Sequence, residues 1–334
     1  MSRRNWIQAV FGLVIGAGCL ALALRGVEFG RMRAAWAQVE PGWIAASTAA
    51  LLFAHLLRAL RWRLLLAPLT QRRAEGLFSA LMIGYAANSL LPAHLGEFLR
   101  AYVASRRNPG LSASAAFATI VVERILDVIF LTAVMGLVVI VHPFPDWVVM
   151  SGWILLGASA ALSALLLFGK RQEARAAAFV GTLARPLPQR AREKLAQLPR
   201  RFFAGVVPLG KPSRYAAAAA LSFAIWLGYA AMNHACLEAF GLVAAYGLPW
   251  TAGPVVLVFT TLSVVVPSTP GYVGTYHVLC QLALAFFGVP PSEALSFAVV
   301  AHLVNIVPVV LLGLACAQRE GVALLRAAQN GKPA

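Results

Sequence analysis

Charged residues are scarce in this sequence. Of its 334 residues, 12% are charged and 60% are hydrophobic, whereas a soluble domain carries about 25% charged residues. Long apolar runs recur along the whole chain, and runs of this length are typical of segments that have a bilayer as their solvent. The composition excludes an ordinary soluble enzyme. It predicts an all-α polytopic membrane protein that forms a single membrane domain over residues 1–334, with no soluble catalytic domain.

Cysteine is also rare, and no catalytic motif is found. Cys19, Cys236, Cys280 and Cys316 each lie in an apolar run, and no two are spaced as metal ligands or as a redox pair. Zinc spacings, nucleophile elbows and phosphate loops are absent, and the glycine-rich stretch 270–274 has no strand before it. We therefore expect neither a metal nor a cofactor.

Acidic residues are few, with 12 against 28 basic residues, so the formal net charge is +16. The basic residues lie in short loops between apolar runs, where they set topology and contact anionic lipids; nucleic acid is not an expected partner. The longest loop, 169–214, predicts amphipathic helices on an anionic cytoplasmic membrane surface. Its basic residues are Lys170, Arg171, Arg175, Arg185, Arg190, Arg192, Lys194, Arg200, Arg201, Lys211 and Arg214.

Apolar runs of about 20 residues are long enough to cross a bilayer. The sequence predicts six full spans, at roughly 5–24, 42–64, 113–141, 150–168, 215–238 and 294–316. Two further apolar stretches, 76–103 and 252–287, are interrupted in the middle by proline, glycine and polar residues.

Basic residues orient these spans, because short cytoplasmic loops are enriched in lysine and arginine. Arg3 and Arg4 place the N-terminus in the cytoplasm, and Arg319 and Arg326 place the C-terminus there. Basic residues flank the stretch 76–103 on both sides, so it should enter and leave the membrane on the cytoplasmic side as a re-entrant helical hairpin. The stretch 252–287 should be a second re-entrant hairpin that enters from the outside.

This layout repeats. Two spans, a broken hairpin and a third span fill residues 1–141, and the same order fills 150–316 with opposite orientation. The breaks are also similar, because Gly96 and Gly271 each follow a proline by four residues. An inverted repeat of broken helices is typical of transporters, in which the site lies between the repeats. At each break, the alternative to residues that face a cavity is a simple hinge or a tight loop between helices.

Residues at the two breaks are candidates for a site. A broken helix frees backbone amides and carbonyls, which lipid tolerates only where protein or a wet cavity satisfies them. The N-termini of half-helices also favour anions. The candidates are Asn88, Pro92, His94, Gly96, Pro267, Ser268, Thr269, Pro270, Gly271 and Gly274.

Ionisable side chains inside spans are the other signal, because each costs about 2.5–3.5 kcal/mol at a helix centre unless it is paired or hydrated. They are Arg58, Arg61, Glu97, Arg100, Glu123, Arg124 and Asp127. They could be pairs that hold helices together, or they could form an anion or headgroup site. The last five sum to −1, so a headgroup site needs Arg58 or Arg61 nearby, or a protonated carboxylate. Isolated histidines in the second half are more often packing residues than ligands.

Four motifs resemble those of a known family. They are Arg61-Trp-Arg-Leu-Leu-Leu, Asn88-x3-Pro92-x3-Gly96-Glu97-x2-Arg100, Ala118-Thr-x3-Glu123-Arg124-x2-Asp127 and Pro267-x2-Pro270-Gly271-x2-Gly274. Together they resemble the flippase-like membrane domain of lysylphosphatidylglycerol synthases, over nearly the whole chain. One position departs from the family, because His277 stands where a glutamate often follows the second break.

The resemblance implies translocation of a lipid or lipid-linked group across the bacterial inner membrane, by a member without the aminoacyltransferase domain. Arg58, Arg100 and Arg124 would attract an anionic headgroup, and the carboxylates would balance them or carry protons. The lipid need not be a phospholipid, since similar members are associated with hopanoids. A membrane-embedded enzyme acting on lipid or polyprenyl phosphate, a non-transporting subunit of lipid synthesis and a homo-oligomer all stay open.

The topology can be tested by labelling. In a variant whose native cysteines are replaced, a membrane-impermeant thiol reagent should modify Gly110→Cys only from the cytoplasmic side and Gly247→Cys only from the outside. The loop after the first hairpin and the loop before the second hairpin should face opposite sides, as the basic residues indicate. Labelling of both positions from one side would contradict the inverted repeat.

Overall fold

A computed structural model describes residues 14–70, 74–91, 95–141, 146–184, 186, 188–206, 209–263 and 269–329. Every regular element within these ranges is a helix, which confirms the predicted all-α class. After a first helix at Val14–Ala23 come α2 (Phe29–Ala37), α3 (Pro41–Leu66), α4 (Leu77–Leu90), α5 (Leu95–Arg107), α6 (Ala113–Val141), α7 (Asp146–Arg171), α8 (Glu173–Leu183), α9 (Gln189–Phe203), α10 (Pro212–Ala239), α11 (Leu242–Tyr246), α12 (Ala252–Leu262), η1 (Pro270–Tyr272), α13 (Thr275–Ala285) and α14 (Pro291–Gln329).

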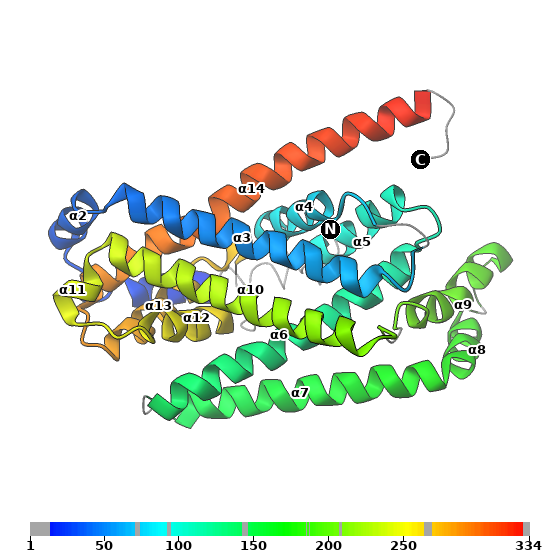
Figure 1. Ribbon diagram of the computed structural model, residues 1–334, viewed down its shortest axis with the longest axis horizontal. Coiled ribbons are helices and arrows are strands. Elements are labelled where there is room, and N and C mark those ends of the chain that lie inside the picture. Colours follow the sequence, from blue (N-terminus) through cyan, green and yellow to red (C-terminus); the bar gives the residue numbers. More distant parts are fainter. Residues whose placement is uncertain are drawn as a thin grey trace.

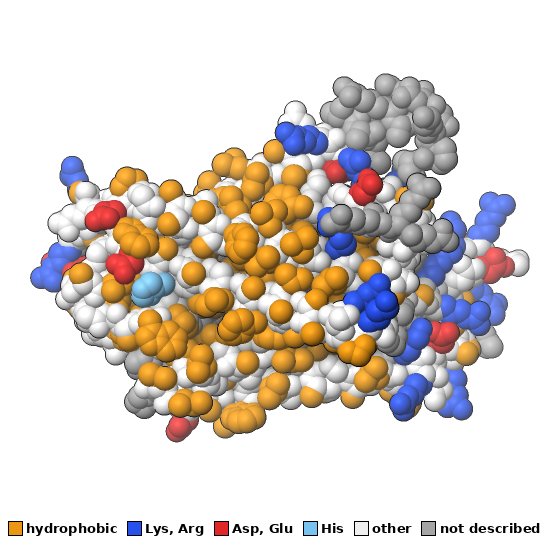
Figure 2. All heavy atoms as spheres, in the orientation of Figure 1, with side chains coloured by type: hydrophobic (Ala, Val, Ile, Leu, Met, Phe, Trp, Pro, Cys, Tyr) orange, Lys and Arg blue, Asp and Glu red, His pale blue; other side chains and the backbone are white. Residues whose placement is uncertain are grey.

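Five helices in the described part of the chain are long and apolar enough to cross a bilayer: α3, α6, α7, α10 and α14. They contain five of the predicted spans. Of the sixth, residues 5–13 lie outside the described part and Val14–Ala23 is helical. Figure 2 shows hydrophobic side chains over the middle of the visible face, with charged side chains gathered towards its ends. Such a surface suits a hydrocarbon environment.

The long helices α3 and α10 lie side by side and run in opposite directions (Figure 1). Small residues allow this close approach, since a Cβ added to Gly228 would lie 3.2 Å from Cβ of Ala54. The hydroxyl of Ser47 also donates a hydrogen bond of 2.8 Å to the carbonyl of Met232 across the pair. These two helices form a central pair, and the helices α4, α12 and α14 pack around it.

Both interrupted stretches are pairs of short helices that pack against each other, α4 with α5 and α12 with α13. The longest of the four, α4, has 14 residues. At 1.5 Å per residue it extends roughly 21 Å, which is less than the roughly 30 Å hydrocarbon thickness of a bilayer. The breaks predicted from proline and glycine are therefore real interruptions of helix.

Glycine is required at the first break by a close helix crossing. A Cβ on Gly96 would overlap the carbonyl oxygen of Gly84 on α4. The amide of Gly96 donates a hydrogen bond of 2.8 Å to Oδ1 of Asn88, so this asparagine satisfies one of the free amides at the start of α5. At the second break Gly271 and Gly274 have φ values of 72° and 92°, which disfavour any side chain.

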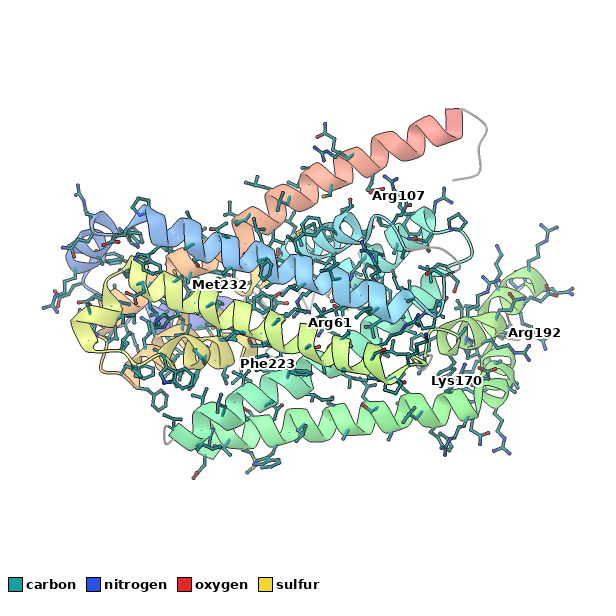
Figure 3. The ribbon with its side chains drawn as sticks, viewed as in Figure 1. Arg61, Arg107, Lys170, Arg192, Phe223 and Met232 are labelled. Carbon is teal, nitrogen blue, oxygen red and sulfur yellow. The ribbon has the colours of Figure 1, made fainter. Side chains whose placement is uncertain are left out.

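The basic loop predicted at 169–214 folds as the end of α7 followed by the helices α8 and α9, which pack on each other. Figures 2 and 3 show lysine and arginine side chains, Lys170 and Arg192 among them, gathered at this end of the molecule. The ammonium of Lys170 donates a hydrogen bond of 2.9 Å to the carbonyl of Phe203. An apolar groove of about 620 Å³ is lined by residues of α5, α6, α8 and α9. Contact of this loop with an anionic lipid surface stays a prediction.

Candidate functional site

A cavity of about 410 Å³ lies where the two breaks meet. Asn88, Ser89 and Glu97 line it from the first break, and Gly271 and Tyr272 line it from the second. A Cβ on Gly271 would lie 3.5 Å from the carbonyl oxygen of Ser89, so the two hairpins touch here. The remaining polar side chains of the lining are His55, Arg58, Tyr85, Arg124, Asp127, Tyr229, Asn233, Thr260, Thr261, Ser263, Tyr276, His302 and Asn305.

The carboxylate of Asp127 is surrounded by three guanidinium groups. Arg58 Nη1 lies 2.7 Å from Oδ2, and Arg61 Nη2 lies 2.7 Å from Oδ1. Arg124, one turn earlier on the same helix, contacts Oδ2 at 3.4 Å. Asp127 therefore joins α6 to two arginines of α3, and its short contacts are charge-assisted hydrogen bonds.

Glu123 forms the second centre of the network and is fully buried. Its Oε2 accepts a hydrogen bond of 2.7 Å from Arg100 Nη2, and its Oε1 accepts one of 3.2 Å from Arg61 Nη2. The guanidinium of Arg100 also lies over the ring of Trp62, 3.8 Å from the centroid. This cation–π contact and the ion pair fix α5 to α3 and α6. Figure 3 places Arg61 in the interior between the long helices.

The whole cluster contains more positive than negative charge. Four guanidinium groups, those of Arg58, Arg61, Arg100 and Arg124, meet three carboxylates, those of Glu97, Glu123 and Asp127, which leaves a formal charge of +1. Arg58 and Arg61 both lie near the other charges, as a headgroup site would require. The histidine nearest the cluster, His55, contacts the Tyr229 hydroxyl rather than a carboxylate.

Arg124 and Arg100 have different surroundings. Arg124 lines the cavity, its side chain is 39% exposed, and its contacts are long: 3.8 Å to Glu97 Oε1 and 3.3 Å to the Tyr85 hydroxyl. Arg100 is buried behind the cavity wall, as is Arg61. Of the three arginines expected to attract a headgroup, Arg58 and Arg124 therefore line the cavity, whereas Arg100 does not.

Other predicted site residues are distributed as follows. Pro92, His94, Pro267 and Ser268 lie outside the described residues. Thr269 packs against Gly16 of the first helix, and Pro270 begins the turn η1. The ring of His277 accepts a hydrogen bond of 3.3 Å from the amide of Gly274, and neither residue lines the cavity. Among the described residues, no group of three or more His, Cys, Asp and Glu side chains is placed to hold a metal ion.

Several aromatic residues of the cavity had no part in the sequence argument. The Tyr229 hydroxyl accepts a hydrogen bond of 2.7 Å from Arg58 Nε. The ring of Tyr276 stacks on that of His302 at 4.5 Å, and His302 Nε2 hydrogen-bonds the carbonyl of Gly271 at 2.7 Å. Sequence spacing could have indicated two of these tyrosines. Tyr85 precedes Ser89, and Tyr229 precedes Asn233, by one helical turn, so each pair lies on one helix face.

Long apolar helices around a charged internal cavity define this molecule as a multi-pass membrane protein. It belongs to the family of the lysylphosphatidylglycerol synthase TM region, whose sequence model matches residues 9–313. This confirms the resemblance drawn from the four motifs.

One curated relative is the glycosyltransferase AglD of Haloferax volcanii, which is 27% identical over 341 aligned residues. The alignment covers 90% of this chain and 52% of AglD, so the chain spans about half the length of this relative. No solved structure matches the chain.

The two arginines should differ in their effect on stability. Arg100→Gln leaves Glu123 buried with one partner fewer, and breaking a buried pair costs about 3–5 kcal/mol. Arg124→Gln removes a partly exposed cation with long contacts, and exposed pairs contribute about 0–1 kcal/mol. Thermal unfolding of the purified variants in one detergent should show a large loss for Arg100→Gln alone, with Arg31→Gln on the surface helix α2 as the control. Equal losses of thermal stability for Arg100→Gln and Arg124→Gln would show that Arg124 also has a structural role.

Proposed function

We propose that this protein translocates a lipid with an anionic headgroup across the bacterial inner membrane. The headgroup would pass through the central cavity while the acyl or isoprenoid tails stay in the bilayer. The observation that carries this proposal is the cavity at the meeting point of two broken helices, lined by apolar side chains and by the partly exposed Arg124. Charge inside a membrane domain is costly and commonly marks a substrate pathway.

We infer an inverted repeat, which would suit transport by alternating access. The helix Val14–Ala23, α3, the α4–α5 hairpin and α6 occur in the same order as α7, α10, the α12–α13 hairpin and α14. In Figure 1, α4 and α5 lie towards the end that holds α8 and α9, whereas α12 and α13 lie towards the end that holds α2 and α11. We infer that both hairpins are re-entrant and enter from opposite faces. Rocking of one half against the other would then open the cavity to each side in turn.

The basic end of the molecule would face the cytoplasm, with both termini on that side. Its arginines and lysines on α9 would contact the anionic lipids of the inner leaflet, each worth about 1 kcal/mol near the surface. The apolar groove between α5 and α9 lies next to this surface and would accept lipid tails. Because α5 lines both the groove and the cavity, tail and headgroup could occupy both at once.

The loose contact between Arg124 and Glu97 supports a role in headgroup binding. An anion in the cavity would gain a partner that the protein itself holds only at 3.4–3.8 Å. Arg58 lines the same cavity, although its Nε and Nη1 already donate hydrogen bonds of 2.7 Å to Tyr229 and Asp127. The incoming phosphate would neutralise the cluster, so binding would be favoured by charge as well as by geometry.

A membrane-embedded enzyme acting on a lipid or polyprenyl phosphate is the second candidate. The observation in its favour is the relative named as a glycosyltransferase, although the chain covers only 52% of that protein. An enzyme would change the covalent structure of the lipid, whereas a flippase changes only its leaflet. Analysis of the lipid after incubation with the pure protein therefore separates the two.

Translocation can be measured in proteoliposomes with a tail-labelled anionic phospholipid whose leaflet is read by dithionite quenching. Wild type should move the lipid faster than protein-free vesicles, and Arg124→Gln should slow it about tenfold or more, since a hydrogen bond to a charged group contributes about 1.5–3 kcal/mol. Glu123→Ala should also lose activity, while Glu193→Ala on the exposed face of α9 should not.

Folding must be checked for each variant by monodispersity, because Glu123 is buried. Equal activity of Arg124→Gln and wild type would remove the headgroup role of this arginine. A chemically altered lipid would favour the enzyme, and no movement above that of empty vesicles would reject the flippase.

A further inference from the structure

We propose that the part of the headgroup beyond the phosphate is neutral and carries hydroxyl groups, as glycerol and sugars do, and that the cavity rejects headgroups bearing an ammonium group. This inference rests on the proposed function and names its substrate class. It is not the expectation from the family name, since lysylphosphatidylglycerol carries a lysyl cation.

The first observation is the charge at the arginine end of the cavity. Both carboxylates that line the cavity lie among arginines: Asp127 contacts three of them, and Glu97 contacts Arg124 at 3.8 Å through Oε1, while its Oε2 is buried without a hydrogen-bond partner among the described residues. The cluster retains a formal charge of +1, and like charges brought together in a medium of low dielectric repel strongly. An ammonium group would therefore meet repulsion here, while a phosphate would be attracted.

The second observation is the neutral character of the wall that the second half of the chain contributes. In the described part of the second half, the residues that line the cavity include no Asp, Glu, Lys or Arg. The wall is built instead from the aromatic rings of Tyr272, Tyr276 and His302 and from the amides of Asn233 and Asn305. An ammonium group at this wall would receive no counter-charge from the residues of the second half, and an unpaired charge is costly inside a membrane domain.

The third observation is a buried acceptor among these neutral groups. The side chain of Asn233 donates a hydrogen bond of 2.9 Å to the carbonyl of Tyr229, but its Oδ1 is buried and accepts none from any described residue. A buried acceptor needs a donor, and a hydroxyl group is a neutral donor. Sites built to bind a hydroxyl group discriminate strongly against analogues that lack it.

The spacing of these groups fits one headgroup. Tyr229 accepts a hydrogen bond from Arg58, and Asn233 lies one turn further along α10, about 6 Å away at 1.5 Å per residue. A phosphate beside Arg58 and Arg124 would place the hydroxyl groups of a glycerol or a sugar close to Asn233. The cavity can thus contact both parts of such a headgroup, one by charge and the other by neutral hydrogen bonds.

Binding of four phospholipids with matched acyl tails, and of one sugar-linked polyprenyl phosphate, to the purified protein tests this inference and can be measured by native mass spectrometry. The probes are phosphatidylglycerol, a sugar-linked polyprenyl phosphate, phosphatidic acid, phosphatidylethanolamine and lysylphosphatidylglycerol. We expect at least one of the two hydroxyl-bearing phosphates to bind about tenfold more tightly than the two ammonium lipids and more tightly than phosphatidic acid. The tighter of the two identifies whether the source is a phospholipid or a sugar carrier.

Two variants test the rejection of ammonium groups and the preference for hydroxyl groups separately. Asn305→Asp adds a carboxylate to the neutral wall with little change of shape, and should raise binding of lysylphosphatidylglycerol about tenfold while weakening that of phosphatidylglycerol. Asn233→Ala should abolish the preference for hydroxyl-bearing lipids over phosphatidic acid. Gln38→Glu, on the exposed end of α2, adds the same charge outside the cavity and should leave the order unchanged.

The outcomes are distinguishable. Equal or tighter binding of lysylphosphatidylglycerol by wild type, or an unchanged order in Asn305→Asp, would overturn the rejection of ammonium groups. Equal binding of phosphatidylglycerol, the sugar-linked phosphate and phosphatidic acid by wild type would overturn the hydroxyl preference and leave the anion site standing. Failure of every phosphate lipid to bind would instead overturn the proposed function on which the inference rests.

Discussion

The ion pairs around Asp127 and Glu123 are the interaction on which the rest of this structure depends. Neither carboxylate could stay ionised alone in the interior of a membrane domain, and neither could the arginines beside them. Because these side chains come from α3, α5 and α6, each helix needs the other two in place to satisfy its own charge. The network therefore ties the first broken hairpin to the long helices that support it.

The ion pairs of this network differ in contact distance and in burial. The pairs made by Arg58, Arg61 and Arg100 include bonds of 2.7 Å and are buried, so they form a rigid frame. Arg124 contacts Glu97 at 3.8 Å, next to the break between α4 and α5, and is the most exposed member of the group. A ligand that competes for a weakly held cation displaces little of the existing structure. The proposed headgroup site at Arg124 can therefore lie beside the buried ion pairs without disturbing them.

Much of the fold could be predicted because membrane helices follow simple rules of length and hydropathy. Five spans appeared where the apolar runs place them, and the two interruptions at Gly96 and Gly271 follow from backbone conformations and close approaches that glycine permits. The all-α class and the family followed from the same features. The re-entrant entry of the hairpins and the inverted repeat remain predictions that labelling can test.

The pairing of the charges could not be predicted. The sequence of α3 alone does not indicate that Arg58 and Arg61 contact Asp127. That contact depends on how α3 packs against α6, and the paired residues are more than 60 positions apart in the chain. For the same reason Arg100 turned out to lie behind the cavity, against Trp62, although it follows a break in the helix. The wall of Tyr276 and His302 was missed because single aromatic residues in apolar helices are usually packing residues.

The most direct measurement of the central claim is a cryo-electron microscopy map of the protein in nanodiscs made from anionic lipid. We expect a lipid headgroup in the central cavity, with its phosphate within hydrogen-bond distance of the Arg124 guanidinium and its tails leaving between the helices. A cavity filled by protein side chains, or lipid found only on the outer surface of the helices, would contradict it.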